Sequence, residues 1–245
     1  MTKKKIVVID IGTHKCQEFL AMFHTNPFIL FARITAHKIL RLASPTYRET
    51  FSMISSQNIL KKNRNRFFTI LTEPNTNVLS HYLYDKADQV FCVAIGKTSE
   101  NIKLSNLYFH SAKIDLDEQG SSIFEEKQGK KSTFSLPIIQ VDPQYYLNFI
   151  KKNIEQKFPD VDYEIVLRMN CEGSEYDVIQ EAKKIFGTQF NLILGSLDDV
   201  LKYQGQDVYD QMEIFLDEHR IDFKEFNTIL TSHEQALKAL VLKLN

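Results

Sequence analysis

The stretch VLRMNCEGSEYDVIQ, residues 166–180, places polar residues and a glycine directly after an apolar run. Asn170, Glu172 and Gly173 stand where a buried strand should simply end, and a helix-like pattern follows them. In an open α/β sheet, ligands bind outside the carboxyl ends of the strands. We therefore interpret these residues as one part of a ligand site and look for the rest at the ends of the other predicted strands.

The ends of three further apolar runs supply groups suited to a nucleoside. The first run ends VIDIGTHKC, where Gly12 allows a tight turn and the close approach of a ligand to the backbone. The second ends LTEPN, where the Glu73 carboxylate can accept hydrogen bonds from both hydroxyls of a ribose. The plainer explanation of Glu73 is a solvated acid at a helix start. The third run ends VAIG, where Ala94 and Ile95 can flank a flat base.

Phosphate-binding loops are missing from the sequence. A dinucleotide site favours G-x-G-x-x-G, which leaves the helix N-terminus bare, but residues 12–16 read GTHKC with a single glycine. The P-loop pattern G-x-x-x-x-G-K-[ST] is also absent, which argues against an ATPase. S-adenosylmethionine carries no phosphate, so a loop that binds it tolerates bulkier residues.

The elements that must position these residues alternate between strand and helix. The predicted strands are 5–10, 66–71, 89–95, 163–169 and 190–194, and helical patterns cover 14–23, 75–86 and 174–187. Four of the five strands are nearly continuous in apolar character, as in a parallel sheet covered on both faces by helices. This order predicts an α/β fold, a doubly wound and mostly parallel sheet within one domain, 1–245.

Two stretches interrupt this alternation. Residues 26–65 exceed the length of one helix between the first and second strands, so we predict a basic helical insertion there. Residues 101–109 and 133–142 read as extra strands beside the sheet. Between them, we predict that 110–132 is a mobile loop.

Composition and cysteine usage are those of a globular protein from a reducing compartment. No apolar run approaches the roughly 18 residues that a membrane span needs. The short run after MTKKK ends on Asp10 and Gly12, so we interpret it as a strand rather than a signal peptide. Because Cys16, Cys92 and Cys171 share no CxxC spacing and the histidines lie apart, we predict a cytoplasmic protein without a metal site.

Charge is uneven along the chain, although the net charge is −1. Residues 33–66 contain eight basic residues and one acid, whereas 198–222 is acid-rich. The apolar segment 26–45 has three interpretations: a helix packed on the domain, an interfacial helix in peripheral contact with a membrane, or a surface for an anionic acceptor. Nucleic acid is disfavoured because no known binding motif or aromatic–basic stacking pattern accompanies the charge.

Six motifs follow one another along the chain: VIDIGTHKCQEF, TILTEPNTNVL, VFCVAIGKTSENIKL, GSSIFEEK, VD at 141–142 and VLRMNCEGSEYDVIQ. Their order resembles that of the FkbM-like class I methyltransferases, whose motifs are similar to D-x-G-A-N-x-G, F-E-P-N, A-x-G, S-S-L, T-L-D and K-I-D-V-E-G-A-E. The resemblance runs from about residue 5 to about residue 185. It implies a Rossmann-like fold, S-adenosylmethionine as the cofactor, and O-methylation, often of a sugar or other secondary-metabolite hydroxyl.

The resemblance also implies roles for individual residues. Asp10 and Gly12 would lie near the methionine moiety of the cofactor, Glu73 at the ribose, and Ala94 and Ile95 beside the adenine. The full set of predicted cofactor-binding residues is Asp10, Gly12, Thr13, His14, Glu73, Asn75, Ala94, Ile95 and Asn170. The candidate general bases, in order, are Glu172, His14 and Asp142.

Three positions depart from the family pattern. Cys16 replaces the last glycine of the first motif, His14 replaces its asparagine, and Asn170 replaces the aspartate of the last motif. We predict an S-adenosylmethionine-dependent O-methyltransferase acting on a sugar, glycan or secondary-metabolite hydroxyl. The departures keep an alternative open, a catalytically inactive methyltransferase-like binding module in glycan or surface-polymer synthesis.

Overall fold

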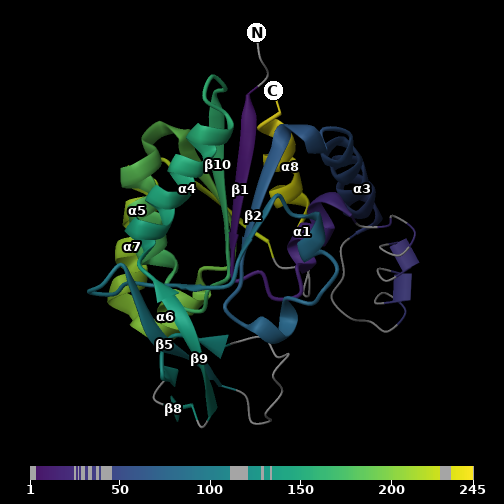
Figure 1. The fold of residues 1–245 in the computed structure, drawn as a ribbon. Coiled ribbons are helices and arrows are strands. Elements are labelled where there is room, and N and C mark those ends of the chain that lie inside the picture. Colours follow the sequence, from purple (N-terminus) through teal and green to yellow (C-terminus); the bar gives the residue numbers. More distant parts are fainter. Residues whose placement is uncertain are drawn as a thin grey trace.

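A six-stranded parallel sheet forms the centre of the computed structural model (Figure 1). Its strands are β1 (Lys5–Ile11), β2 (Phe67–Thr72), β3 (Gln89–Phe91), β10 (Tyr163–Met169), β11 (Phe190–Gly195) and β12 (Asp222–Glu225). Their order is β12-β11-β10-β1-β2-β3, and every neighbouring pair is parallel. The predicted doubly wound α/β class is confirmed.

The structure describes residues 4–24, 46–110, 121–127, 130–132, 134–226 and 233–244, together with 26, 28, 31, 32, 35, 36 and 39. Most of the segment 26–45 and half of the predicted loop 110–132 lie outside these residues. Among the described residues, no helix combines the length and apolar character needed to cross a bilayer.

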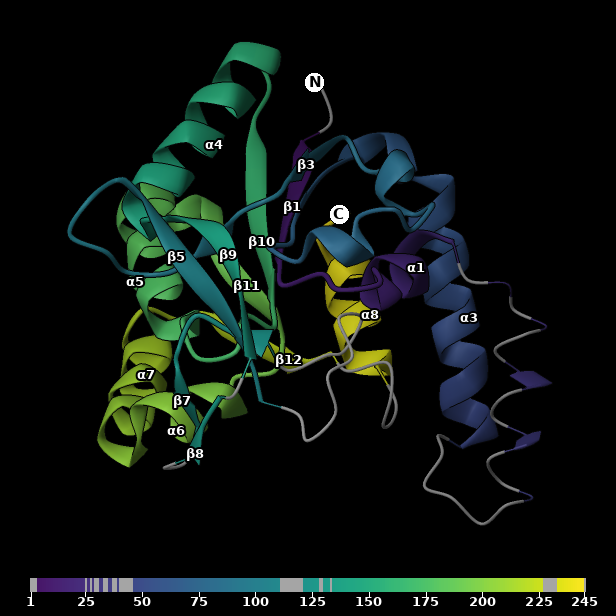
Figure 2. The ribbon, with the colours of Figure 1, turned by 60° about the horizontal axis from the view of Figure 1, so that its bottom comes forward.

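Helices cover both faces of the sheet, as the apolar strands require. One face carries α1 (Gln17–Phe23), α3 (Tyr47–Lys62) and α8 (Glu234–Leu242), and the other carries α4 (Pro143–Lys157), α5 (Glu175–Phe186), α6 (Asp198–Gln204) and α7 (Gln206–Glu218) (Figures 1 and 2). Strand β1 serves both layers, since Ile6 and Val8 pack into one apolar cluster while Val7 and Ile9 pack into the other. This double burial explains why the strand sequence is continuously apolar.

The sheet order reverses between β1 and β10, which are neighbours although 158 positions separate Lys5 from its partner Tyr163. Ligands of doubly wound folds bind at such a switch point, outside the carboxyl ends of the strands. Gly12 brings the two strand ends together: with φ at 77°, a Cβ on this residue would lie 2.1 Å from the carbonyl oxygen of Asn170. Only glycine tolerates both conditions.

A second sheet lies beyond this edge, at the bottom of Figure 1. It contains β4 (Ala94–Ile95), β9 (Phe134–Val141), β5 (Ile102–Phe109) and β6 (Ser121–Ser122), in that order. The extra strands predicted at 101–109 and 133–142 are therefore present. The predicted loop 110–132 also contains secondary structure, namely β6 and the hairpin of β7 (Glu126–Lys127) and β8 (Lys130–Lys131).

Two predicted elements are wrong in detail. The strand predicted at 89–95 is broken after Phe91, and its second half, β4, belongs to the other sheet. The helix predicted at 75–86 consists of two short 3₁₀ turns, Thr76–Val78 and Tyr84–Lys86. The Asn75 side chain accepts hydrogen bonds from the backbone and side-chain nitrogens of Asn77, and such local bonds compete with regular helix.

The described part of the predicted insertion 26–65 is mainly α3. Its first turn forms a capping box, in which the Thr46 hydroxyl accepts a hydrogen bond from the backbone of Glu49 and the Glu49 carboxylate accepts one from that of Thr46. Helix α3 packs beside α1 and α8. Among the described positions before it, Phe28 and Ile39 are 83% and 76% exposed.

We expect Gly12→Ala to destabilise the protein more than Gly187→Ala. Both glycines have positive φ, but an added Cβ at Gly187 meets nothing within 4 Å. The control should therefore lose only about 1–3 kcal/mol for backbone strain, and Gly12→Ala should lose about 2 kcal/mol more for its overlap with Asn170. Urea unfolding of both variants measures the difference. Equal losses would show that the strand ends are not held in close approach.

Candidate functional site

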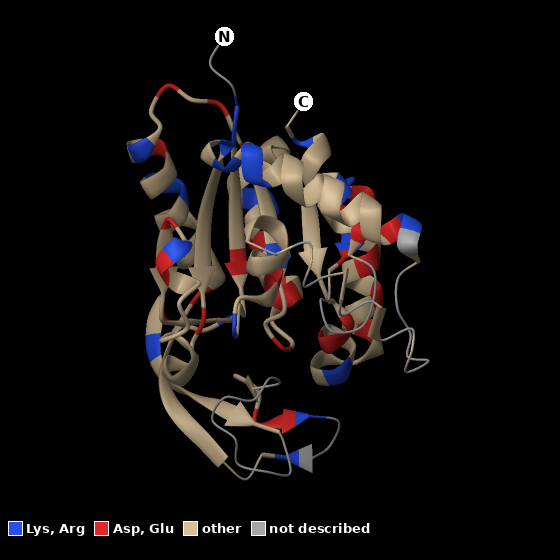
Figure 3. Cartoon of the chain, turned by 90° about the vertical axis from the view of Figure 1, so that its right-hand side faces the viewer, with Lys and Arg blue, Asp and Glu red and all other residues tan. Residues whose placement is uncertain are grey.

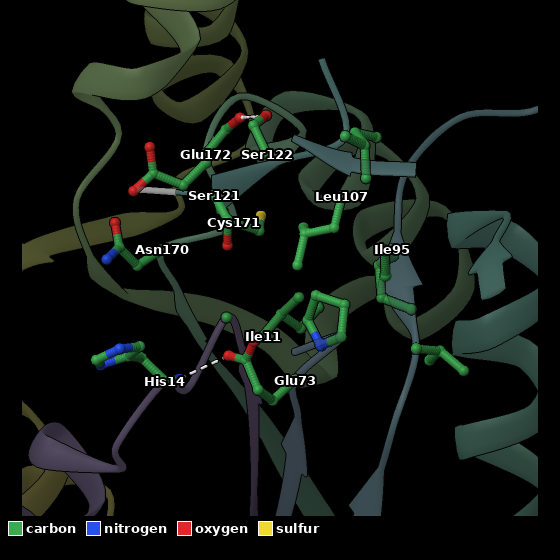
Figure 4. A pocket seen from close by; sticks show the side chains of 15 residues that line it. Ile11, His14, Glu73, Ile95, Leu107, Ser121, Ser122, Asn170, Cys171 and Glu172 are labelled. Carbon is green, nitrogen blue, oxygen red and sulfur yellow. Dashed lines mark hydrogen bonds between the residues drawn. The ribbon is translucent and has the colours of Figure 1, made fainter. Parts of the chain in front are cut away.

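An open cavity lies at the switch point (Figure 4), with about 560 Å³ of empty space when the solvent at its mouth is included. It is lined by Ile11, Gly12 and His14 after β1, Glu73 and Pro74 after β2, Val93, Ala94 and Ile95 around β4, Leu107 on β5, Ser121, Ser122 and Ile123 around β6, and Asn170, Cys171 and Glu172 after β10. One side is apolar, and the ends carry carboxylate, amide and hydroxyl groups. The second sheet thus forms the wall that faces the carboxyl edge of the first.

Glu73 is the most constrained acid in the cavity. It is 5% exposed, and its two carboxylate oxygens accept backbone N–H groups from His14 at 2.7 Å and from Asn75 at 2.9 Å. Burial raises the pKa of this carboxyl to about 7, although these two bonds pull it down. Each oxygen keeps a further lone pair, so the group can accept two more hydrogen bonds from neighbouring hydroxyls.

The loop after β1 holds left-handed residues that are not glycine. His14 has φ at 45° and Cys16 has φ at 56°, a conformation that costs about 1–2 kcal/mol for such residues. The buried hydroxyl of Tyr84 holds the loop, since it lies 2.6 Å from the Thr13 hydroxyl and donates to the carbonyl of His14 at 2.6 Å. The hydrogen bonds of Tyr84 therefore hold the backbone of the first motif in place.

A buried ion-pair cluster supports the floor of the cavity. Arg168 on β10 is 3% exposed and donates to Asp10 at 3.0 Å, to Glu18 of α1 at 2.9 Å and to the carbonyl of Gly12 at 2.9 Å. Burial raises the pKa of Asp10 to about 6, because the Arg168 guanidinium offsets only part of the desolvation cost. This cluster joins β1, β10 and α1 directly beneath the loop that carries His14.

The loop after β10 is held by Glu175, the first residue of α5. Glu175 is fully buried, and its carboxylate oxygens accept backbone N–H groups from Cys171 at 2.9 Å and Gly173 at 2.8 Å. Burial raises the pKa of Glu175 to about 7. The backbone of Asn170 donates to the carbonyl of Ile11, which ties this loop to the end of β1.

Glu172 lies between the cavity and the second sheet. Its φ is 55°, and its carbonyl accepts a hydrogen bond from the Ser122 hydroxyl at 2.6 Å. Its carboxylate lies 3.4 Å from both Lys127 Nζ and the Tyr203 hydroxyl. Burial raises the pKa of Glu172, and the negative charge of Asp199 raises it further, while Lys127 opposes the shift. A carboxylate with a raised pKa is a better proton acceptor than a solvated one.

Comparison with known proteins assigns the chain. A family model described as the methyltransferase FkbM domain matches residues 34–224, most of the chain. The chain belongs to the FkbM methyltransferase family. No curated protein and no solved structure matches it. The match begins after β1, so the FkbM model covers Glu73, the second sheet and the β10 loop but not Gly12 or His14.

Seven of the residues predicted for an FkbM-type site line the cavity: Gly12, His14, Glu73, Ala94, Ile95, Asn170 and Glu172. Three predicted cofactor-binding residues do not line it. Asp10 is buried with Arg168, Thr13 is buried against Tyr84, and Asn75 turns toward Asn77.

Two further residues lie away from the cavity. Asp142, the third candidate base, caps α4 by accepting the backbone N–H groups of Gln144 and Tyr145. Cys16 is fully buried, whereas Cys171 lines the cavity. Within the described ranges, no group of three or more His, Cys, Asp or Glu residues is arranged to hold a metal ion.

Reasoning from strand ends missed the contribution of the second sheet. Leu107, Ser121, Ser122 and Ile123 enter the cavity from β5 and β6. The serine pair stands in GSSIFEEK, a stretch quoted above for its family resemblance, and that was the available signal. No sequence pattern indicated the role of Arg168, because a single basic residue within an apolar strand does not reveal which acids it will pair with.

We expect Arg168→Met to lower the free energy of unfolding by about 3–5 kcal/mol near pH 8, because it leaves two carboxylates buried without their cation. The loss should shrink near pH 5, where Asp10 can be protonated. Adding Asp10→Asn should recover part of the loss. Denaturant unfolding of the single and double variants tests this, and no recovery would contradict the assignment of Asp10 as the partner of Arg168.

The free energy of unfolding should fall as the pH rises from about 4 to about 7. Asp10, Glu73 and Glu175 have folded-state pKa values of about 6, 7 and 7, above their ordinary values of 3.8, 4.5 and 4.5. The folded state therefore binds more protons between these values, and each of the three groups lowers the free energy of unfolding by about 1 kcal/mol per pH unit while the pH lies between its two pKa values. Glu175→Gln should flatten the profile measured by urea unfolding. An unchanged slope would show that Glu175 does not titrate there.

Proposed function

We propose that this FkbM-family protein is an S-adenosylmethionine-dependent O-methyltransferase that acts on a hydroxyl of a sugar, glycan or secondary metabolite. The observation that carries the proposal is the position of Glu73. Glu73 directly follows β2 at the edge of the cavity, and two backbone amides orient its carboxylate. The apolar residues Ala94 and Ile95 line the same cavity (Figure 4). The three cysteines are unpaired, which agrees with a reducing, cytoplasmic compartment.

The chemistry of the cavity residues fits a nucleoside cofactor. Glu73 would accept both ribose hydroxyls, and the apolar residues Ile11, Val93 and Ile95 would enclose the base. Gly12 leaves room beside the Asn170 backbone that any Cβ would fill. Bound S-adenosylmethionine would supply an activated methyl group, so the protein's main task is to position the acceptor oxygen in line with it.

Glu172 is the residue best placed to take the proton from an acceptor hydroxyl. It lines the cavity, its pKa is raised, and it faces Lys127 and Tyr203, which can hold the carboxylate in place. His14 is the second candidate. Its backbone N–H is used to orient Glu73, which gives it a positioning role whatever its ring does.

The alternative of an inactive binding module rests on Asn170 and on the left-handed Cys16. Asn170 presents a neutral amide to the cavity where the resemblance implies an aspartate. A neutral side chain weakens attraction for the cofactor's amino group, so the first test measures binding rather than turnover.

Titration calorimetry with S-adenosylhomocysteine is that test. We expect micromolar binding by the native chain, about −8 kcal/mol. Glu73→Ala should weaken it at least about 30-fold, equivalent to about 2 kcal/mol for the lost hydrogen bonds to a charged group. Glu155→Ala, at an exposed position on α4, is the control and should bind as the native chain does.

The outcomes separate the two functions. Binding that is lost only in Glu73→Ala supports the enzyme and the ribose contact. Binding that is equal in both variants removes Glu73 from the site. No heat and no thermal stabilisation of the native chain at millimolar ligand would reject the methyltransferase proposal and favour the binding module.

A further inference from the structure

A second cleft lies beside the cavity and is lined by residues 124–126, which lead into β7, and by residues 201–205 at the end of α6. Figure 2 shows β7 next to α6. The cleft holds about 1060 Å³ of empty space, open to solvent, and its walls include Phe124, Glu126, Leu201, Lys202 and Tyr203. The function proposed above leaves this cleft unassigned.

The cleft and the cavity share a wall. Ser121, Ser122 and Ile123 line the cavity, and the next residue, Phe124, lines the cleft. The Ser122 hydroxyl accepts the backbone N–H of Phe124 at 3.2 Å and donates to the carbonyl of Glu172 at 2.6 Å. The chain therefore passes from the cavity to the cleft between Ile123 and Phe124, and this partition is hydrogen-bonded to the loop after β10.

Glu172 reaches this partition with its side chain. Its carboxylate contacts Tyr203, a residue of the cleft, and Lys127, whose ammonium lies 4.9 Å from the centre of the Tyr203 ring. Tyr203 packs closely on Gly173: a Cβ added to Gly173 would lie only 2.7 Å from the Cβ of Tyr203. Both contacts to the Glu172 carboxylate are 3.4 Å long, near the outer limit of a hydrogen bond. A hydroxyl arriving from the cleft at a normal distance would bind it more strongly.

The side chains of the cleft favour one class of acceptor. The Phe124 and Tyr203 rings lie 5.6 Å apart and form an aromatic wall, against which the C–H face of a sugar ring can pack while its hydroxyls reach polar groups. The charged residues that line the cleft are Glu125, Glu126 and Lys202, and Lys202 is paired with Asp199 at 2.7 Å. The hairpin at the bottom of Figure 3 carries charges of both signs.

We propose that this cleft is the acceptor subsite and that it takes an uncharged or amino-bearing saccharide, presenting one hydroxyl to Glu172. Phosphorylated and carboxylated saccharides are disfavoured, because Glu125 and Glu126 line the cleft and the lining cation Lys202 is already paired with Asp199. This inference rests on the proposed methyltransferase function, since it places the acceptor hydroxyl at Glu172, which lines the cofactor cavity and contacts Tyr203 of the cleft.

Saturation-transfer NMR on the full chain, recorded with and without S-adenosylhomocysteine, tests whether the cleft binds cellobiose, glucosamine and glucose 6-phosphate. We expect signals from the first two and none from the third. Phe124→Ala should weaken cellobiose binding at least tenfold and leave the affinity for S-adenosylhomocysteine within twofold. Glu126→Lys, at an exposed position in the cleft, should make glucose 6-phosphate bind, whereas Glu155→Lys on α4 should not.

Three results would overturn the subsite. They are silence from both cellobiose and glucosamine, glucose 6-phosphate binding equal to theirs in the native chain, and unchanged cellobiose binding in Phe124→Ala. If Phe124→Ala fails to fold, the exposed Glu126→Lys variant still decides the charge preference. Failure of S-adenosylhomocysteine to bind would reject the proposed function separately, because the sugar signals are also recorded without it.

Discussion

The whole site depends on the close approach of the carboxyl ends of β1 and β10. Gly12 permits the approach because any side chain there would overlap the Asn170 carbonyl. Arg168 stabilises it by bonding to Asp10, Glu18 and the Gly12 carbonyl. Since these contacts join both central strands and α1, they fix where both cavity loops begin. Both loops contain left-handed residues other than glycine, and such residues persist where the surrounding structure fixes the backbone.

Backbone amides orient two further acids of the site, Glu73 and Glu175. Glu73 accepts amides from His14 and Asn75, and Glu175 accepts amides from Cys171 and Gly173. Each carboxylate thereby shapes the loop that surrounds it. The pKa of each stays near 7 because burial outweighs these bonds. The same groups that order the loops are therefore close to titrating at neutral pH, so loop geometry and proton binding are coupled.

The sequence predicts the fold well because burial on both faces leaves a direct mark, the continuous apolar strands, and Ser174 and Gly187 mark the ends of α5. It predicts Glu73 and Glu172 because both follow such strands. It does not predict that Asp10 points to Arg168, since pairing across 158 positions leaves no local pattern. The helix predicted for 75–86 is wrong because the Asn75 side chain bonds to the backbone of Asn77 and favours a short turn. The single strand predicted for 89–95 is wrong because its two halves belong to different sheets.

The division of that run has a functional consequence. Because β4 leaves the central sheet and pairs with β9, the second sheet is anchored directly at the cavity's apolar wall. Strand β5 then carries β6 across the carboxyl edge, and β6 bonds to the carbonyl of Glu172. A chain that kept 89–95 in one sheet would leave the edge open to solvent. The break after Phe91 therefore gives the site its cover, and it brings the stretch 121–124 to the place where the proposed cofactor cavity meets the proposed acceptor cleft.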